Sequence, residues 1–203
     1  NEGFYVDVGA EHPIEGSVTK HFYDRGWNGI NIEPVPKFFE LIKQDRPRDI
    51  NIQCVASDRD HQLLRLHVAE GTGLSSVNPQ YQQNLESQLN TKIQNLEVRS
   101  QRLSTILSKH AKQRIDFLKI DVEGHENEVL EGGLVSIKKY KPLLIIESFP
   151  PKQSKVVESL KDLGFKIWDA DRLSTIKENS NNLFAWHPDG PLKKESLKNV
   201  IHL

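Results

Sequence analysis

Residues 117–126 read FLKIDVEGHE: a short apolar run ends at Asp121, and a turn with two further acids and a histidine follows it. Such a run, with little polar alternation, is typical of a strand buried on both faces of a parallel sheet. Four other runs have this form and also end on an acid, namely on Asp7, Glu33, Asp58 and Glu147. Because open α/β sheets bind ligands at the carboxyl ends of their strands, we expect these five carboxylates around one crevice.

Helical segments alternate with the apolar runs, which predicts a doubly wound, mostly parallel, seven-stranded Rossmann-like sheet. One strand is expected over residues 51–57. The expected helices follow a Ser17 cap, the pair Pro34 and Pro36, and a Ser104 cap, and then span residues 126–134 and 153–163. No helix separates strands 165–169 and 183–187, so we expect an antiparallel pair at one edge.

Residues 63–68 and 96–103 read as two further strands that would pair as an antiparallel side hairpin. Residues 71–95 between them are rich in Gly, Ser, Asn and Gln, and a polar connection of this length is usually functional or disordered. We expect a mobile segment over the acceptor side of the crevice. Residues 1–190 would form one domain, with residues 191–203 as a C-terminal tail.

The composition is that of an ordinary globular domain, with 203 residues, 36% of them hydrophobic, and a net charge of −1. This charge gives no general attraction to nucleic acid or to an anionic membrane, and no apolar stretch approaches the roughly 18–20 residues of a membrane span. The single cysteine, Cys54, cannot form an internal disulfide and reads as a buried thiol. We expect a cytoplasmic protein; its oligomeric state stays open, a dimer included.

The loop after the first strand does not fit a dinucleotide. Gly9 begins it, but the second and third glycines of G-x-G-x-x-G are missing, and Glu11 and Glu15 place negative charge where a pyrophosphate would lie. S-adenosylmethionine fits better, since it lacks phosphate and carries a sulfonium and an ammonium. Glu33 at the second strand end would accept the ribose hydroxyls, a geometry that also serves dinucleotides.

Several segments resemble the FkbM family of S-adenosylmethionine-dependent methyltransferases. They are FYVDVGA, DRGWNGINIEPVP, RPRDINIQCVASD, LKIDVEGHENEVLEGG and LLIIES, in order from residue 4 to about residue 148. The resemblance implies a class I methyltransferase fold, with the cofactor held by the first three strand ends. It also implies methylation of a hydroxyl of a sugar, glycan or polyketide-type natural product. The cofactor residues we predict are Asp7, Gly9, Ala10, Ser17, Glu33, Pro34, Ser57, Asp58 and Asp121, with Ser57 and Asp58 facing the adenine.

Transfer to an alcohol needs a group that removes its proton, because a hydroxyl is a poor acid. The turn after residue 120 supplies three catalytic candidates, Asp121, Glu123 and His125. An unperturbed histidine changes charge near working pH, which makes His125 a credible base. Asp121 would instead act as a base or bind the cofactor ammonium. A divalent ion such as Mg²⁺ is a further alternative, with Asp121 and Glu147 as its first ligands.

Two other functions stay open at this point. One is an NAD-type oxidoreductase on the same sheet. The other is a catalytically silent cofactor-binding module within a larger glycan-modifying protein.

Overall fold

The protein is built on a seven-stranded sheet at the centre of the computed structural model, which describes residues 3–79, 91–111, 114–149, 153–172, 174–177 and 180–193. The strand order is β10-β11-β9-β8-β1-β2-β3. The bounds are β1 Phe4–Val8, β2 Asn28–Ile32, β3 Ile50–Ile52, β8 Phe117–Ile120, β9 Leu143–Glu147, β10 Lys166–Asp169 and β11 Asn182–Trp186. Only β11 runs against its neighbours, and it pairs with both β9 and β10. The predicted mostly parallel sheet with an antiparallel element at one edge is therefore confirmed.

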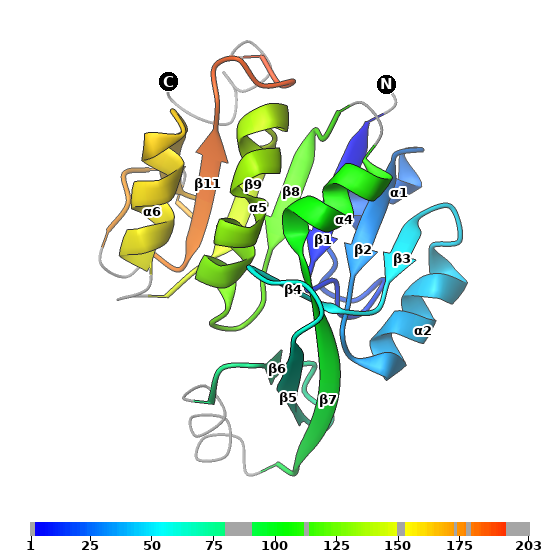
Figure 1. Cartoon of the computed structure of the whole chain (residues 1–203). Helices are drawn as coiled ribbons and strands as arrows, with labels where there is room; N and C mark the ends of the chain where they lie inside the picture. Colours follow the sequence, from blue (N-terminus) through cyan, green and yellow to red (C-terminus); the bar gives the residue numbers. More distant parts are fainter. Residues whose placement is uncertain are drawn as a thin grey trace.

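Both faces of the central strands are covered, which explains their apolar runs. Val6 and Val8 face α4 (Leu103–His110), α5 (Glu126–Tyr140) and α6 (Gln153–Asp162), which contribute to the same core and cover one face in Figure 1. Tyr5 points the other way and packs with Tyr23 of α1 (Lys20–Asp24). The helix α2 (Pro36–Asp45) lies beside β3 at the sheet edge.

Two of the predicted helix starts are wrong. The cap residue of α1 is Thr19 rather than Ser17, whose hydroxyl instead accepts a hydrogen bond from Arg46. Ser104 lies inside α4, which begins at Leu103. In both cases the serine side chain alone did not specify the backbone turn.

The helix expected over residues 126–134 continues to Tyr140, so its two glycines do not end it. A Cβ atom on Gly132 would lie 1.9 Å from the carbonyl oxygen of Ser57, and one on Gly133 would lie 2.8 Å from the Leu103 side chain. These glycines therefore serve the close approach of α5 to its neighbours.

The strand expected over residues 51–57 is divided between two sheets, which corrects the prediction. Its second part, β4 (Val55–Ser57), leaves the central sheet and pairs in parallel with β7 (Ile93–Arg102). The second sheet has the order β4-β7-β5-β6, with β5 at Leu63–Ala69 and β6 at Ser75–Ser76. The chain has to turn between β3 and β4 to join it.

The predicted side hairpin is confirmed, because β5 and β7 pair antiparallel over seven residues from Leu63↔Arg99 to Ala69↔Ile93. We call residues 63–79 and 91–102 the arm; it projects from the carboxyl-end side of the central sheet (Figure 1). Its base is fixed by a small core in which Leu66 and Val68 pack with Val35 and Phe38. Residues 80–90 of the expected mobile segment and 194–203 of the expected tail lie outside the described residues.

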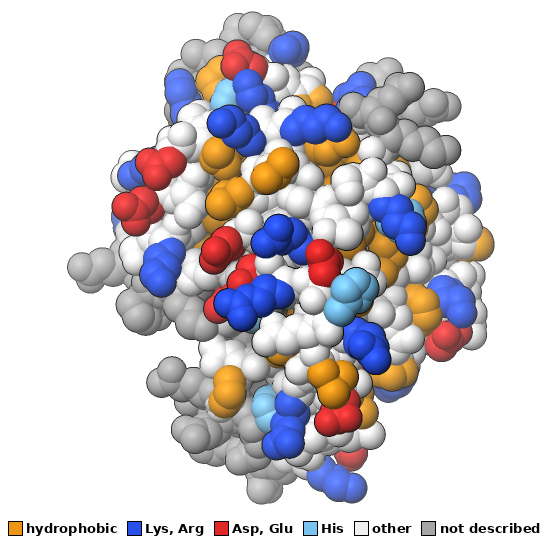
Figure 2. Space-filling view, in the orientation of Figure 1, with side chains coloured by type: hydrophobic (Ala, Val, Ile, Leu, Met, Phe, Trp, Pro, Cys, Tyr) orange, Lys and Arg blue, Asp and Glu red, His pale blue; other side chains and the backbone are white. Residues whose placement is uncertain are grey.

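The surface agrees with the near-neutral charge of the sequence. On the face shown in Figure 2, basic and acidic side chains are interspersed rather than segregated. None of the described helices is long and apolar enough to cross a membrane. Cys54 is a free thiol buried at 2% exposure, and this burial raises its pKa to about 12.

Candidate active site

A pocket lies between the carboxyl ends of the central strands and the arm, where open α/β sheets bind their ligands. Its wall on the sheet side includes six residues predicted from the sequence: Gly9, Glu33, Pro34, Asp121, Glu123 and His125. Residues 73–77 and Leu66 of the arm form the opposite wall. The crevice expected from the strand ends is therefore a pocket that the arm closes on one side.

The turn after β1 brings the backbone against the next active-site loop. Gly9 has φ +75°, and a Cβ atom there would lie 1.8 Å from the carbonyl oxygen of Asp121, so only glycine fits. The N–H groups of Gly9 and Ala10 donate to the Ile32 carbonyl, and that of Glu11 donates to the Glu33 carboxylate. These donors are already satisfied, and α1 begins only at Lys20. No helix N-terminus therefore follows this turn directly, and the N–H groups of residues 9–11 are not available to a pyrophosphate.

Glu33 is a carboxylate buried at 3% exposure at the end of β2. Its two oxygens accept the N–H groups of Val35 and Glu11, each at 2.8 Å. Burial raises the pKa of Glu33 to about 7, although the two N–H donors oppose this. Each oxygen keeps a second lone pair, so the side chain has acceptor capacity left for ligand hydroxyls.

Asp7 does not line the pocket but supports it from beneath. It lies within β1, accepts a 2.5 Å hydrogen bond from Thr19, and lies 3.5 Å from the ammonium of Lys119. Lys119 also contacts Asp121 at 3.0 Å and donates to the Gly9 carbonyl at 3.1 Å. Burial alone would lower the pKa of Lys119, but Asp7 and Asp121 outweigh it and raise the pKa, so the side chain stays charged.

Sequence reasoning overlooked Lys119, although a charged residue inside an apolar strand run was a usable signal. It also overlooked Arg46, which is 1% exposed and donates to the Pro13 carbonyl and to the hydroxyls of Ser17 and Thr19. This guanidinium ties Pro13 to Ser17 and Thr19 in the loop between β1 and α1, residues 9–19, which we call the cofactor loop. The Ser17 hydroxyl is therefore bonded to Arg46 of the same chain. Nothing in the sequence around Arg46 indicated that contact.

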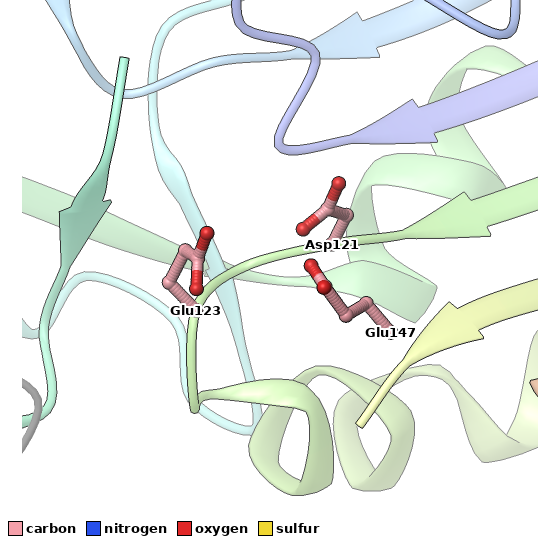
Figure 3. Close-up of side chains that lie close together, drawn as sticks. All are labelled: Asp121, Glu123 and Glu147. Carbon is pink, nitrogen blue, oxygen red and sulfur yellow. The ribbon is translucent and has the colours of Figure 1, made fainter. Parts of the chain in front are cut away.

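Three carboxylates meet at the ends of β8 and β9. One oxygen from each of Asp121, Glu123 and Glu147 lies within 4.8 Å of the others, and Figure 3 shows Asp121 and Glu147 facing each other. Burial, followed by the hydrogen bond and charge of Asp121, raises the pKa of Glu147 to about 9. Burial also acts to raise the pKa of Asp121, but Lys119 and the Glu147 hydrogen bond outweigh it and lower that pKa. The two pKa values shift in opposite directions, which favours a proton on Glu147 and a charge on Asp121.

His125 lies at the start of α5 and lines the pocket. Its Nε2 lies 3.0 Å from the hydroxyl of Ser57, and its Nδ1 lies 3.5 Å from the carboxylate of Glu128. Ser57 is buried at the end of β4 and also donates to Asp58, which pairs with Arg59 at 3.4 Å. Ser57 and Asp58 therefore stand beside the candidate catalytic histidine, one layer behind the pocket wall.

The strand order and the acid-lined pocket at the strand ends fit a Rossmann-like methyltransferase. A family model described as the methyltransferase FkbM domain matches residues 7–167, most of the chain. The chain belongs to the FkbM family of methyltransferases, a family whose methyl donor is S-adenosylmethionine. This membership favours methyl transfer over the NAD-type oxidoreductase that the sheet alone would allow.

One solved structure of a methyltransferase shares the fold, and a second is reported beside it. A crystal structure of methyltransferase FkbM from Methylobacillus flagellatus KT is similar to 92% of this chain, with a TM-score of 0.53 and 16% sequence identity. The match spans 44% of the length of that protein. A crystal structure of a TehB-like SAM-dependent methyltransferase from Corynebacterium glutamicum matches 90% of this chain, with a TM-score of 0.48 and 12% sequence identity. That match covers 78% of the length of the Corynebacterium protein. A comparison with curated protein sequences found no significant match.

Proposed function

We propose that the protein transfers a methyl group from S-adenosylmethionine to a hydroxyl of a sugar, a glycan or a polyketide-type natural product. The observation that carries this proposal is the Asp121–Glu147 pair with Glu123 beside it, at the wall of the pocket that Glu33 also lines. A hydroxyl group both donates and accepts hydrogen bonds, and this pair offers an ionised acceptor next to a protonated donor.

The residues of the cofactor half fit a cationic, phosphate-free ligand. Glu33 would accept the ribose hydroxyls, with Gly9 and Pro34 against the ligand. Ser57 and Asp58 would support the adenine end from behind the pocket wall. Asp7, Ala10 and Ser17 would act through the loop, because their contacts are with the protein. Asp121, at the boundary between the two halves, would also attract the cofactor ammonium.

Asp121 is the proposed acceptor of the hydroxyl proton. Its lowered pKa makes it a weak base, but the oxygen of an alcohol becomes strongly acidic as a methyl group bonds to it, so a weak base can take the proton late. In-line displacement mainly requires alignment of the two reacting atoms, which the carboxylates would provide. His125 is the second candidate base, since hydrogen bonds at catalytic groups often rearrange when the substrate binds.

A divalent ion is a second use of the same cluster. Three carboxylate oxygens within 4.8 Å of one another suit Mg²⁺, which favours hard oxygen ligands and would acidify a bound hydroxyl. The proton on Glu147 would have to leave for the ion to bind. If transfer is metal-dependent, activity should disappear when EDTA is added and return when Mg²⁺ is restored.

The test is methyl transfer from radiolabelled S-adenosylmethionine to a pool of sugars, oligosaccharides and polyketide alcohols, with and without EDTA. Loss of transfer in Asp121→Asn with S-adenosylhomocysteine still bound would support Asp121 as the base. If only His125→Ala loses methyl transfer while it still binds S-adenosylhomocysteine, His125 is the base instead. S-adenosylhomocysteine binding without transfer to any acceptor would favour the silent module.

A further inference from the structure

Residues 73–78 of the arm, which we call the bridge segment, touch both acidic sides of the pocket. Five of them, residues 73–77, line it. At one end of the bridge segment Gly73 lies against Glu11 of the cofactor loop. At the other end Ser76 and Asn78 bond to the turn that carries Glu123.

The contacts at the Glu123 end fix two successive peptide groups. The hydroxyl of Ser76 donates to the Glu123 carbonyl at 2.6 Å, and the side-chain amide of Asn78 donates to the Gly124 carbonyl at 3.3 Å. The Ser76 oxygen in turn accepts the backbone N–H of Asn78 at 3.0 Å. Ser76 is 1% exposed, so the bonds of its hydroxyl are shielded from competing water.

The turn needs such support because its backbone is strained. Glu123 has φ +53°, in the left-handed region, which costs a non-glycine residue about 1–2 kcal/mol. A residue held there is retained only where its surroundings determine the conformation. Here that conformation brings the Glu123 carboxylate within 4.8 Å of those of Asp121 and Glu147.

The contact at the cofactor end has a similar form. Glu11 also has a positive φ, +51°, and its N–H is bonded to Glu33. A Cβ atom on Gly73 would lie 1.8 Å from the Glu11 carboxylate oxygen, so the missing side chain leaves room for that acid. The bridge segment therefore spans from Glu11, which is bonded to Glu33, to the turn of Glu123, which lies beside Asp121.

We propose that Ser76, assisted by Asn78, is a positioning residue of the arm that holds Glu123 against Asp121 and Glu147 and so sets the geometry at the acceptor side. The arm is thus part of the catalytic apparatus as well as a wall of the pocket. The expected effect of Ser76 on turnover rests on the proposed function. The expected effect of Ser76 on the position of the Glu123 carboxylate is independent of that function.

The experiment compares Ser76→Ala and Asn78→Ala with the wild type. Thr91→Ala is the matched control, because Thr91 makes the same kind of hydroxyl-to-carbonyl bond, to Glu70, at the exposed part of the arm. Carboxyl ¹³C NMR of glutamate-labelled protein gives the titration midpoint of Glu147, assigned with Glu147→Gln. Calorimetry gives the affinity for S-adenosylhomocysteine, and thermal melts report folding.

In Ser76→Ala the Glu147 midpoint is expected to fall by about half a pKa unit, because a repelling carboxylate about 5 Å away is lost. Affinity for S-adenosylhomocysteine should stay within about twofold, and kcat on any methylated acceptor should drop on the order of 10-fold, since small misplacements of reacting groups are costly. Asn78→Ala should show smaller changes in the same direction, and Thr91→Ala none.

An unchanged Glu147 midpoint in folded Ser76→Ala and Asn78→Ala would overturn the proposal, whatever the melting temperature does. So would a parallel loss of S-adenosylhomocysteine affinity, which would assign the bridge segment to cofactor binding. If the wild type methylates no acceptor, the NMR midpoint and the calorimetry still decide the positioning role while the proposed function fails.

Discussion

The pH dependence of cofactor binding follows from Glu33, and the substitution Glu33→Gln tests it. The carboxylate is buried, accepts two backbone N–H groups, and has a pKa of about 7. Only its ionised form accepts hydrogen bonds at every lone pair, so ribose hydroxyls should bind the ionised form best. Protonation as the pH falls through 7 should therefore weaken binding.

The size of the effect follows from the pKa. About one-tenth of Glu33 is ionised at pH 6 and about nine-tenths at pH 8, so Kd for S-adenosylhomocysteine should rise about 10-fold between pH 8 and pH 6. The cluster beside it should not titrate in this window, because Glu147 has a pKa of about 9 and that of Asp121 is lowered. Isothermal calorimetry at both pH values measures the ratio.

In Glu33→Gln the affinity at pH 8 should fall about 10- to 100-fold, the loss expected for a hydrogen bond to a charged group, and the pH dependence should vanish. Unfolding in urea should cost about 1–3 kcal/mol, because one of the two N–H donors would face the new amide nitrogen. Equal affinity at pH 6 and 8 in the wild type, or the same slope in both proteins, would refute the role of Glu33.

Three further predictions concern the support of the pocket. Gly9→Ala should abolish S-adenosylhomocysteine binding and destabilise the fold by more than about 3 kcal/mol in urea unfolding, because its Cβ would overlap a backbone carbonyl. Gly26→Ala, at a similar φ but facing open space, should cost only about 1 kcal/mol, and equal effects of the two would contradict this. Lys119→Met should cost about 3–5 kcal/mol, since Asp7 would stay buried without its cation, and a loss no larger than that of a surface lysine would show the contact to be unimportant. The raised pKa of Glu147 gives stability that is complete below pH 4.5 and is lost as the pH rises through 9; melting temperatures over this range should fall less steeply in Glu147→Gln, and parallel curves would contradict the raised pKa.

Local patterns were sufficient for the central sheet and for part of the site. Four of the five apolar runs that end on an acid became strands of the central sheet, because double-sided burial in a parallel sheet demands such runs. The fifth, before Asp58, is divided between two sheets. The strand-end rule also predicted that Glu33, Asp121 and Glu147 lie in one region, whereas Asp7 and Asp58, which it placed there too, do not line the pocket. The departure from the G-x-G-x-x-G pattern argued against a dinucleotide, and the structure adds that the N–H groups of residues 9–11 already have partners.

Other features depended on contacts between segments distant in sequence. The division of residues 51–57 between two sheets follows from where β7 lies, and the length of α5 follows from its packing against Ser57. The cation that neutralises Asp7 comes from β8, and the bond that holds Glu123 comes from the arm 47 residues earlier.

The sequence by itself determined the fold class and the acidic character of the site. Local sequence patterns show which strands are buried on both faces and which acidic residues follow them. Only the tertiary structure decided which carboxylate keeps its proton and which side chains fix the catalytic turn. Charge coupling and hydrogen bonding depend on distances of a few ångströms, and the spacing of residues along the chain does not contain those distances.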